Sequence, residues 1–74
     1  MTALPPRKDA REILASNMKR IRAEKCWSQE DLALEAELHR TFVAHVESGR
    51  RNISLDNIQK IAVALGVSVG ELLS

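Results

Sequence analysis

The chain has 74 residues, a length that supports one small domain near the lower limit at which a single core stabilises a fold. Hydrophobic residues make up 45% of it but include one Phe, one Trp and no Tyr, so we expect an aliphatic core between helices. A single cysteine excludes a disulfide framework within the chain, and no signal peptide or membrane-spanning run is present, which together predict a cytoplasmic protein.

Charge is unevenly distributed along a chain whose net charge is only +1. Residues 1–27 carry seven Lys or Arg against three Asp or Glu, residues 28–49 carry one against five, and residues 50–74 carry three against two. Because basic ends flank an acidic middle, any binding to nucleic acid would be local rather than an effect of overall charge.

The first part of the chain divides into an arm and a helix. Residues 1–8 contain two adjacent prolines and no helical period, which predicts a flexible arm before a folded domain of residues 9–74. From about Asp9 to Lys25, apolar residues recur at i, i+4 and i+7, which predicts the first helix.

Two helices separated by a tight turn are predicted next. Ser28 has the character of an N-cap, with Asp31 three residues later as the acid of a capping box. Glu37 and Leu38 leave room only for a tight turn before a third helix, which ends at about Glu47. Two helices joined in this way form a helix-turn-helix, whose second helix can lie in the major groove of DNA.

Two further helices complete the predicted fold. Ser54 is a predicted cap for a fourth helix, whose apolar residues keep helical spacing until Gly66. Ser68 and Glu71 form a capping box that starts a short fifth helix. Since no strand pattern is found, we expect an all-α bundle of five short helices.

The outward face of the third helix suits the reading of DNA bases. Arg can bond guanine O6 and N7 with two N–H groups, and Thr can bond a base or offer its methyl group to thymine. For this helix alone, the interpretation that such residues are ordinary solvated side chains stays open. With Val43 and Val46 as the buried side, the predicted base-reading residues on the opposite face are Arg40, Thr41, Ala44 and His45.

Residues on either side of that helix are predicted to bind phosphate. The second helix begins with free backbone N–H groups and the Gln29 side chain, which together favour an anion. Phosphate contacts set the register on a duplex and base contacts set specificity, so both belong in one surface. The other predicted phosphate-binding residues, at the end of the third helix and directly after it, are Ser48, Arg50, Arg51 and Asn52.

The chain from roughly Leu14 to Leu73 resembles the phage repressor and Cro family of helix-turn-helix proteins. Within that family it is most similar to the small controller proteins of restriction-modification systems. The stretches that carry the resemblance are SQEDLA, LHRTFV, ESG, RRNISL and IAVALGVS. The resemblance implies a lambda repressor-like domain. It also implies that Gln29 contacts a phosphate and that Arg40, Thr41 and His45 face the bases. Arg51 and Asn52 would contact the DNA backbone or reach a base.

The resemblance also implies an ion pair between Arg22 and Glu47, which would join the first helix to the third. Both residues adjoin apolar positions at the edge of buried faces, where an unpaired charge would be costly. Cys26 and Glu37 stand where the family usually has Gly, and His39 where it usually has a Ser or Thr cap. If the backbone is left-handed at the first two positions, each costs about 1 kcal/mol.

Metal binding and catalysis are not expected. His39, His45 and Cys26 lack the spacing of a zinc site, because histidines six residues apart on a helix point in different directions. A small helical bundle with an aliphatic core offers no catalytic pocket, so we expect neither an enzyme nor a cofactor or small-molecule ligand. The rival interpretation is an antitoxin or adaptor whose main partner is another protein, since the acidic middle of the chain suits a basic partner.

Apolar residues near the C-terminus exceed what a short helix can bury on a four-helix core. We therefore predict a twofold homodimer through a C-terminal dimerisation helix, with two reading helices about 34–36 Å apart on palindromic double-stranded DNA. The predicted interface residues are Val67, Val69, Leu72 and Leu73. The predicted function is a sequence-specific transcriptional regulator that, by resemblance, controls its own and neighbouring genes, restriction-modification genes among them.

Overall fold

The computed structural model describes residues 9–74, which contain five α-helices and no strand. The predicted all-α bundle is confirmed, and the arm predicted at residues 1–8 lies outside the described residues. None of the described helices is long and apolar enough to cross a membrane. The helices are α1 (Ala10–Glu24), α2 (Gln29–Ala36), α3 (Arg40–Glu47), α4 (Leu55–Leu65) and α5 (Val69–Leu72).

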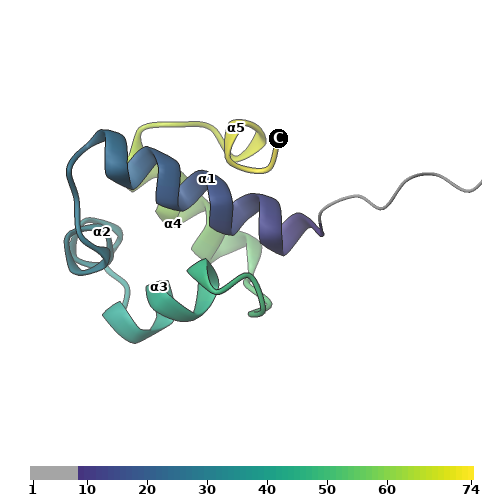
Figure 1. The fold of residues 1–74 in the computed structure, drawn as a ribbon, viewed down its shortest axis with the longest axis horizontal. Coiled ribbons are helices and arrows are strands. Elements are labelled where there is room, and N and C mark those ends of the chain that lie inside the picture. The colour runs from purple at the N-terminus through teal and green to yellow at the C-terminus, as the bar shows by residue number, and fades with distance from the viewer. Residues whose placement is uncertain (1–8) are drawn as a thin grey trace, which may run out of the picture.

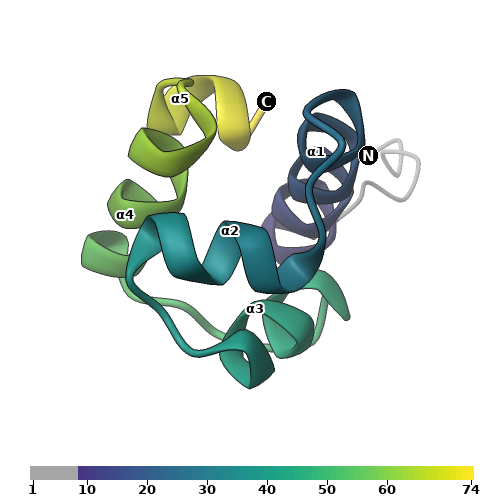
Figure 2. The ribbon, with the colours of Figure 1, turned by 90° about the vertical axis from the view of Figure 1, so that its left-hand side faces the viewer.

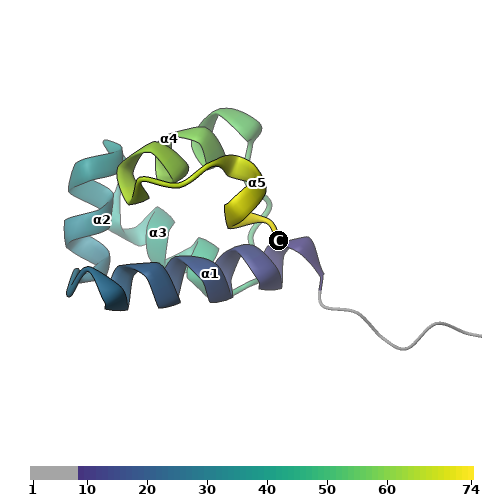
Figure 3. The ribbon, with the colours of Figure 1, turned by 90° about the horizontal axis from the view of Figure 1, so that it is seen from above.

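The long helix α1 and the later helix α4 form two sides of the bundle, and α2 crosses between them (Figures 1 and 2). α2 packs against α3 and α4, whereas α1 packs against α3 and α5. Seen from above, α5 lies between α1 and α4 and closes the end of the bundle away from α2 (Figure 3). This arrangement leaves one side of α3 facing outward.

Every helix contributes to the aliphatic core. The α1 side chain Met18 and the α2 side chain Leu32 are completely buried, as is Ile61 of α4. Burying a side chain of this size stabilises the fold by about 1.5–3 kcal/mol. The other large side chains with less than 2% of their surface exposed are Leu14, Val43, Val46, Leu65 and Leu72.

Leu72, one of the residues predicted at a dimer interface, is buried within the single chain. Leu72 is 0% exposed within the single chain, because α5 turns it toward α1 and α4, so its side chain offers no surface to a second protomer. Val67, Val69 and Leu73, the other residues predicted for the interface, are only partly buried against the core. The side chains available for a dimer are therefore fewer than the sequence suggested.

Each helix begins at a side chain that accepts a hydrogen bond from the backbone of its first turn. Ser28 Oγ accepts from the Asp31 N–H at 3.0 Å, and the Asp31 carboxylate accepts from the Ser28 N–H at 2.8 Å, forming the predicted capping box. The Nδ1 atom of His39 accepts from the Thr41 N–H at 3.1 Å, so His39 replaces the usual hydroxyl cap. The five caps are Asp9, Ser28, His39, Ser54 and Ser68.

The turns that end α1 and α2 contain the two residues that stand in place of glycine. Cys26 has a φ of 59° and Glu37 a φ of 57°, so the backbone is left-handed at both positions. In each turn the next residue closes the helix end: the Trp27 N–H donates to a carbonyl of α1 at 2.9 Å and the Leu38 N–H to one of α2 at 2.8 Å. Trp27 and Leu38 then pack on the core, which offsets the backbone strain.

Candidate nucleic-acid interface

The outward side of α3 carries the predicted base-reading residues. Val43 is 0% exposed and Val46 is 1% exposed, which fixes the inner side of the helix. Because a helix has 3.6 residues per turn, the residues on the side of α3 opposite these valines point away from the core. Arg40, Thr41 and His45 are exposed and Ala44 is half-buried, as the predicted face requires; contact with bases stays a prediction.

The angle of α3 is held by the ion pair expected between Arg22 and Glu47. Arg22 Nε donates to Glu47 Oε2 and Nη2 to Oε1, both at 2.9 Å, while Nη1 donates to the Trp27 carbonyl at 2.8 Å. Glu47 is 5% exposed, so the pair is shielded from water. Its hydrogen bonds raise the pKa of Arg22 above the ordinary value, and the guanidinium stays charged.

Gln29 joins this ion pair, a contact that sequence reasoning missed. Its Nε2 donates to Glu47 Oε1 at 3.1 Å, so the side chain is half-buried against α3. Gln29 is also the first residue of α2, where backbone N–H groups have no preceding helical carbonyl to bond. The predicted phosphate contact therefore falls to those backbone groups and to the second amide hydrogen of Gln29.

The end of α3 and the loop after it bring the other predicted residues together. His45 lines an open hollow on the surface with Arg50, Arg51 and Asn52. All four residues are exposed. The side chains of Arg50, Arg51 and Asn52 carry hydrogen-bond donors suited to an anion. Ser48 ends the helix, with its hydroxyl donating to the His45 carbonyl.

Two contacts hold this loop in place, and neither was predicted. The guanidinium carbon of Arg51 lies 5.0 Å from the centre of the Phe42 ring, a cation–π contact. Arg11, in the first turn of α1, donates from Nη1 to Asn52 Oδ1 at 3.3 Å. The loop is thus attached to α3 on one side and to α1 on the other.

Three large apolar side chains are unusually exposed, among them Leu55, which the helical spacing of the fourth helix had grouped with core residues. Leu34 and Leu55 are each 76% exposed and Val63 is 68% exposed. Val63 lines a hollow between α4 and the end of α2, which it shares with Ala36 and Glu37. In the sequence, Val63 is an apolar residue of α4 that falls outside the stripe of core residues on this helix, and this position indicates its exposure.

Comparison with known proteins agrees with this geometry. Residues 18–72 match a protein family described as helix-turn-helix. The chain is 51% identical to a hypothetical transcription factor of Neisseria meningitidis, over 95% of this chain and 66% of that protein. It is 48% identical to the control protein C.BamHI of Bacillus amyloliquefaciens, over 85% of this chain and 79% of that protein.

The fold is similar to that of a solved relative as well. A crystal structure of the hypothetical transcription factor NHTF from Neisseria matches with a TM-score of 0.88 and 49% sequence identity, covering 100% of this chain and 85% of that one. The resemblance stated from the sequence is confirmed. This chain belongs to the helix-turn-helix family of DNA-binding transcription regulators.

Proposed function

We propose that this chain is a sequence-specific regulator that binds a palindromic operator as a homodimer. The observation that carries the proposal is the exposed face of α3, on a helix fixed by the Arg22–Glu47 ion pair and followed by a basic loop. A rigid helix between two groups of phosphate donors has the parts that reading a duplex requires.

Base reading is assigned to the side chains at the centre of this face. Arg40 is the strongest candidate, since its two-pronged donor matches guanine in the major groove. Thr41, Ala44 and His45 lie beside it, and the short Ala44 side chain allows the helix to approach the bases closely. Binding of the DNA phosphate backbone is assigned to Gln29, Ser48, Arg50, Arg51 and Asn52.

Dimerisation is assigned to the surface around α5. Val67, Val69 and Leu73 are half-buried in the single chain, so each keeps apolar surface that a second protomer could cover. A second copy would cover this region and would place two α3 helices on successive major grooves. It would also double the basic loops on one duplex, which offsets the small charge of each chain.

The regulatory role follows from the relatives. One of them is named a control protein, and by analogy this chain would bind near its own promoter and those of neighbouring genes, restriction-modification genes among them. A protein of this class acts where the DNA lies, so we place it in the cytoplasm. Its action is binding rather than catalysis, and its level in the cell would set the amount of dimer on the operator.

Selection of duplexes from a random pool tests the proposal most directly. We expect enrichment of a palindrome whose half-sites are centred about one helical turn apart. Binding of the selected duplex should weaken steeply with salt, and sedimentation at tens of micromolar should give a dimer. Failure to enrich any sequence, with affinity that ignores salt, would favour an adaptor that binds another protein; a monomer both alone and on the duplex would exclude the twofold arrangement.

A further inference from the structure

The contact between Arg11 and Asn52 joins two parts of the chain that are 41 residues apart in sequence. Arg11 lies in the first turn of α1, and Asn52 lies in the loop that follows α3. Asn52 stands between two hollows of the surface. One is the open hollow shared with His45, Arg50 and Arg51, and the other is an apolar hollow shared with Arg11 and Ile53.

Arg11 is itself held firmly by Asp9. Its Nε donates to Asp9 Oδ1 and its Nη2 to Asp9 Oδ2, both at 3.1 Å, and the Arg11 N–H adds a bond to Oδ1 at 2.8 Å. Both oxygens of the carboxylate are therefore engaged with the same residue. This leaves Nη1 as the nitrogen of the guanidinium that reaches toward the loop, and it meets Asn52 Oδ1 at 3.3 Å.

The chemistry of the two groups fixes the orientation of the Asn52 amide. A guanidinium has donors only, so it accepts no hydrogen bond and requires an oxygen from its partner. An asparagine amide has oxygen on one side and NH₂ on the other, and a reversal of the amide would set NH₂ against the Arg11 donors. With the oxygen held by Arg11, the NH₂ group is directed away from Arg11, and Asn52 lines the hollow that also holds Arg50 and Arg51.

We propose that Arg11 is a positioning residue that turns the Asn52 amide so that its N–H donors, rather than its oxygen, face a phosphate of bound DNA. This inference rests on the proposed function, in which Asn52 belongs to the phosphate-binding loop. A phosphate accepts hydrogen bonds and repels an amide oxygen, so an amide that rotates freely must first be ordered. Arg11 does this before DNA arrives.

A direct contact of Arg11 with phosphate is the competing role. It is disfavoured because the Asp9 carboxylate takes up two of the three guanidinium nitrogens and neutralises the charge locally. The two roles differ in what they require of Asn52. A positioning residue has no effect once Asn52 is removed, whereas a phosphate-binding arginine contributes whatever stands at position 52.

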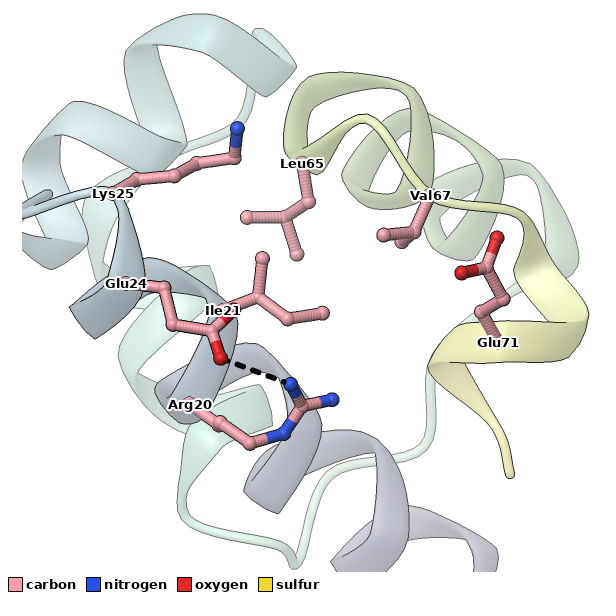
Figure 4. A pocket seen from close by; sticks show the side chains of 7 residues that line it. All are labelled: Arg20, Ile21, Glu24, Lys25, Leu65, Val67 and Glu71. Atoms are coloured by element: carbon pink, nitrogen blue, oxygen red, sulfur yellow. Dashed lines mark hydrogen bonds and ion pairs between the residues drawn. The ribbon is translucent and has the colours of Figure 1, made fainter.

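The experiment is a double-mutant cycle with Arg11→Met and Asn52→Ala, measured by fluorescence anisotropy on a labelled duplex taken from the random-pool selection. Arg20→Met is the matched control. Arg20 is also an arginine of α1 in an exposed ion pair, with Glu24 at 3.3 Å, but it lines a hollow between α1 and the α4–α5 junction (Figure 4). The Arg20→Met substitution removes the same charge as Arg11→Met but leaves the contact with the loop after α3 intact.

We expect Arg11→Met to weaken binding about two- to tenfold beyond the effect of Arg20→Met, the range for one lost hydrogen bond. In the Asn52→Ala background that excess should vanish. Arg11→Lys keeps a donor and should restore most of the affinity. In ¹H–¹⁵N spectra of the free protein, the side-chain amide signals of Asn52 should shift in Arg11→Met and not in Arg20→Met.

Other outcomes overturn the inference in distinguishable ways. An equal loss in both backgrounds would make Arg11 a direct phosphate ligand, and an effect no larger than that of Arg20→Met would leave it without a role in binding. Normal binding by Asn52→Ala would show that the Asn52 amide makes no contact with phosphate, so Arg11 would have no such contact to orient. Absence of duplex binding by the unaltered chain would instead refute the proposed function itself.

Discussion

Arg22 and Glu47 meet side by side, with both pairs of nitrogen and oxygen atoms 2.9 Å apart. Gln29 donates to the same carboxylate at 3.1 Å. Glu47, the last residue of α3, therefore accepts hydrogen bonds from side chains of both α1 and α2. Because α3 holds the predicted base-reading residues, this junction sets the angle at which they are presented.

Replacing Glu47 with Ala is expected to destabilise the domain by about 3 kcal/mol, because Arg22 loses its partner in a place shielded from water. Urea unfolding followed by circular dichroism measures the change. Glu24→Ala provides the control, since its pair with Arg20 is exposed and should contribute about 0.5 kcal/mol or less. Equal effects of the two substitutions would contradict the central role given to Glu47.

Arg40→Ala is expected to relax the base preference at one position of each half-site. The cost on the preferred sequence should be about 1–3 kcal/mol, with little change on a duplex already altered at that base pair. Competition binding with single-base variants of the selected operator measures this. The same loss on every duplex would exclude a base contact by Arg40.

Arg51→Ala should act differently, by weakening every sequence to a similar degree. A lost phosphate contact lowers the slope of log affinity against log salt by about 1 for each chain on the duplex. Phe42→Leu should give part of the same loss, because the aromatic ring that holds the Arg51 guanidinium is gone. A salt titration of wild type and both variants tests the pair, and an unchanged slope for Arg51→Ala would count against phosphate binding.

Glycine at either left-handed turn position should stabilise the protein. Cys26→Gly and Glu37→Gly each relieve a positive φ, and we expect a gain of roughly 0.5–1 kcal/mol from each in chemical denaturation. Gly66→Ala is the converse control. Its φ is 75° and an added Cβ would meet nothing within 4 Å, so any loss reports backbone strain alone. Destabilisation by both glycine substitutions would mean that the native side chains contribute more than the strain costs.

The Asp9–Arg11 contact predicts a dependence of stability on acid. Hydrogen bonds from the Arg11 side chain lower the pKa of Asp9 from 3.8 to about 2. A carboxyl with a lower pKa in the folded state stabilises that state above its unfolded pKa, and this contribution disappears as the pH falls from about 4 to about 2. Comparing the unfolding of wild type and Asp9→Asn over this range tests the sign: the difference should shrink toward pH 2, and a growing difference would contradict it.

The sequence by itself determined the local architecture. The capping boxes Ser28–Asp31 and Ser68–Glu71 link residues three positions apart, so their presence depends on neighbours rather than on the rest of the fold. The stripe of apolar residues on each helix fixed its buried side and therefore placed Arg40 outward. The family resemblance added the Arg22–Glu47 pair, which residue spacing alone would not have found.

Tertiary structure decided which residues meet across long stretches of chain. Arg11 reaches Asn52 only because the first turn of α1 lies beside the loop after α3, and Gln29 reaches Glu47 only because α2 packs on α3. The same packing turned Leu72 inward, away from the surface where the sequence had placed it. The helical period gives the direction in which a side chain leaves the axis of its own helix. The residue that this side chain contacts depends on how the helices pack against one another, and the whole core sets that packing.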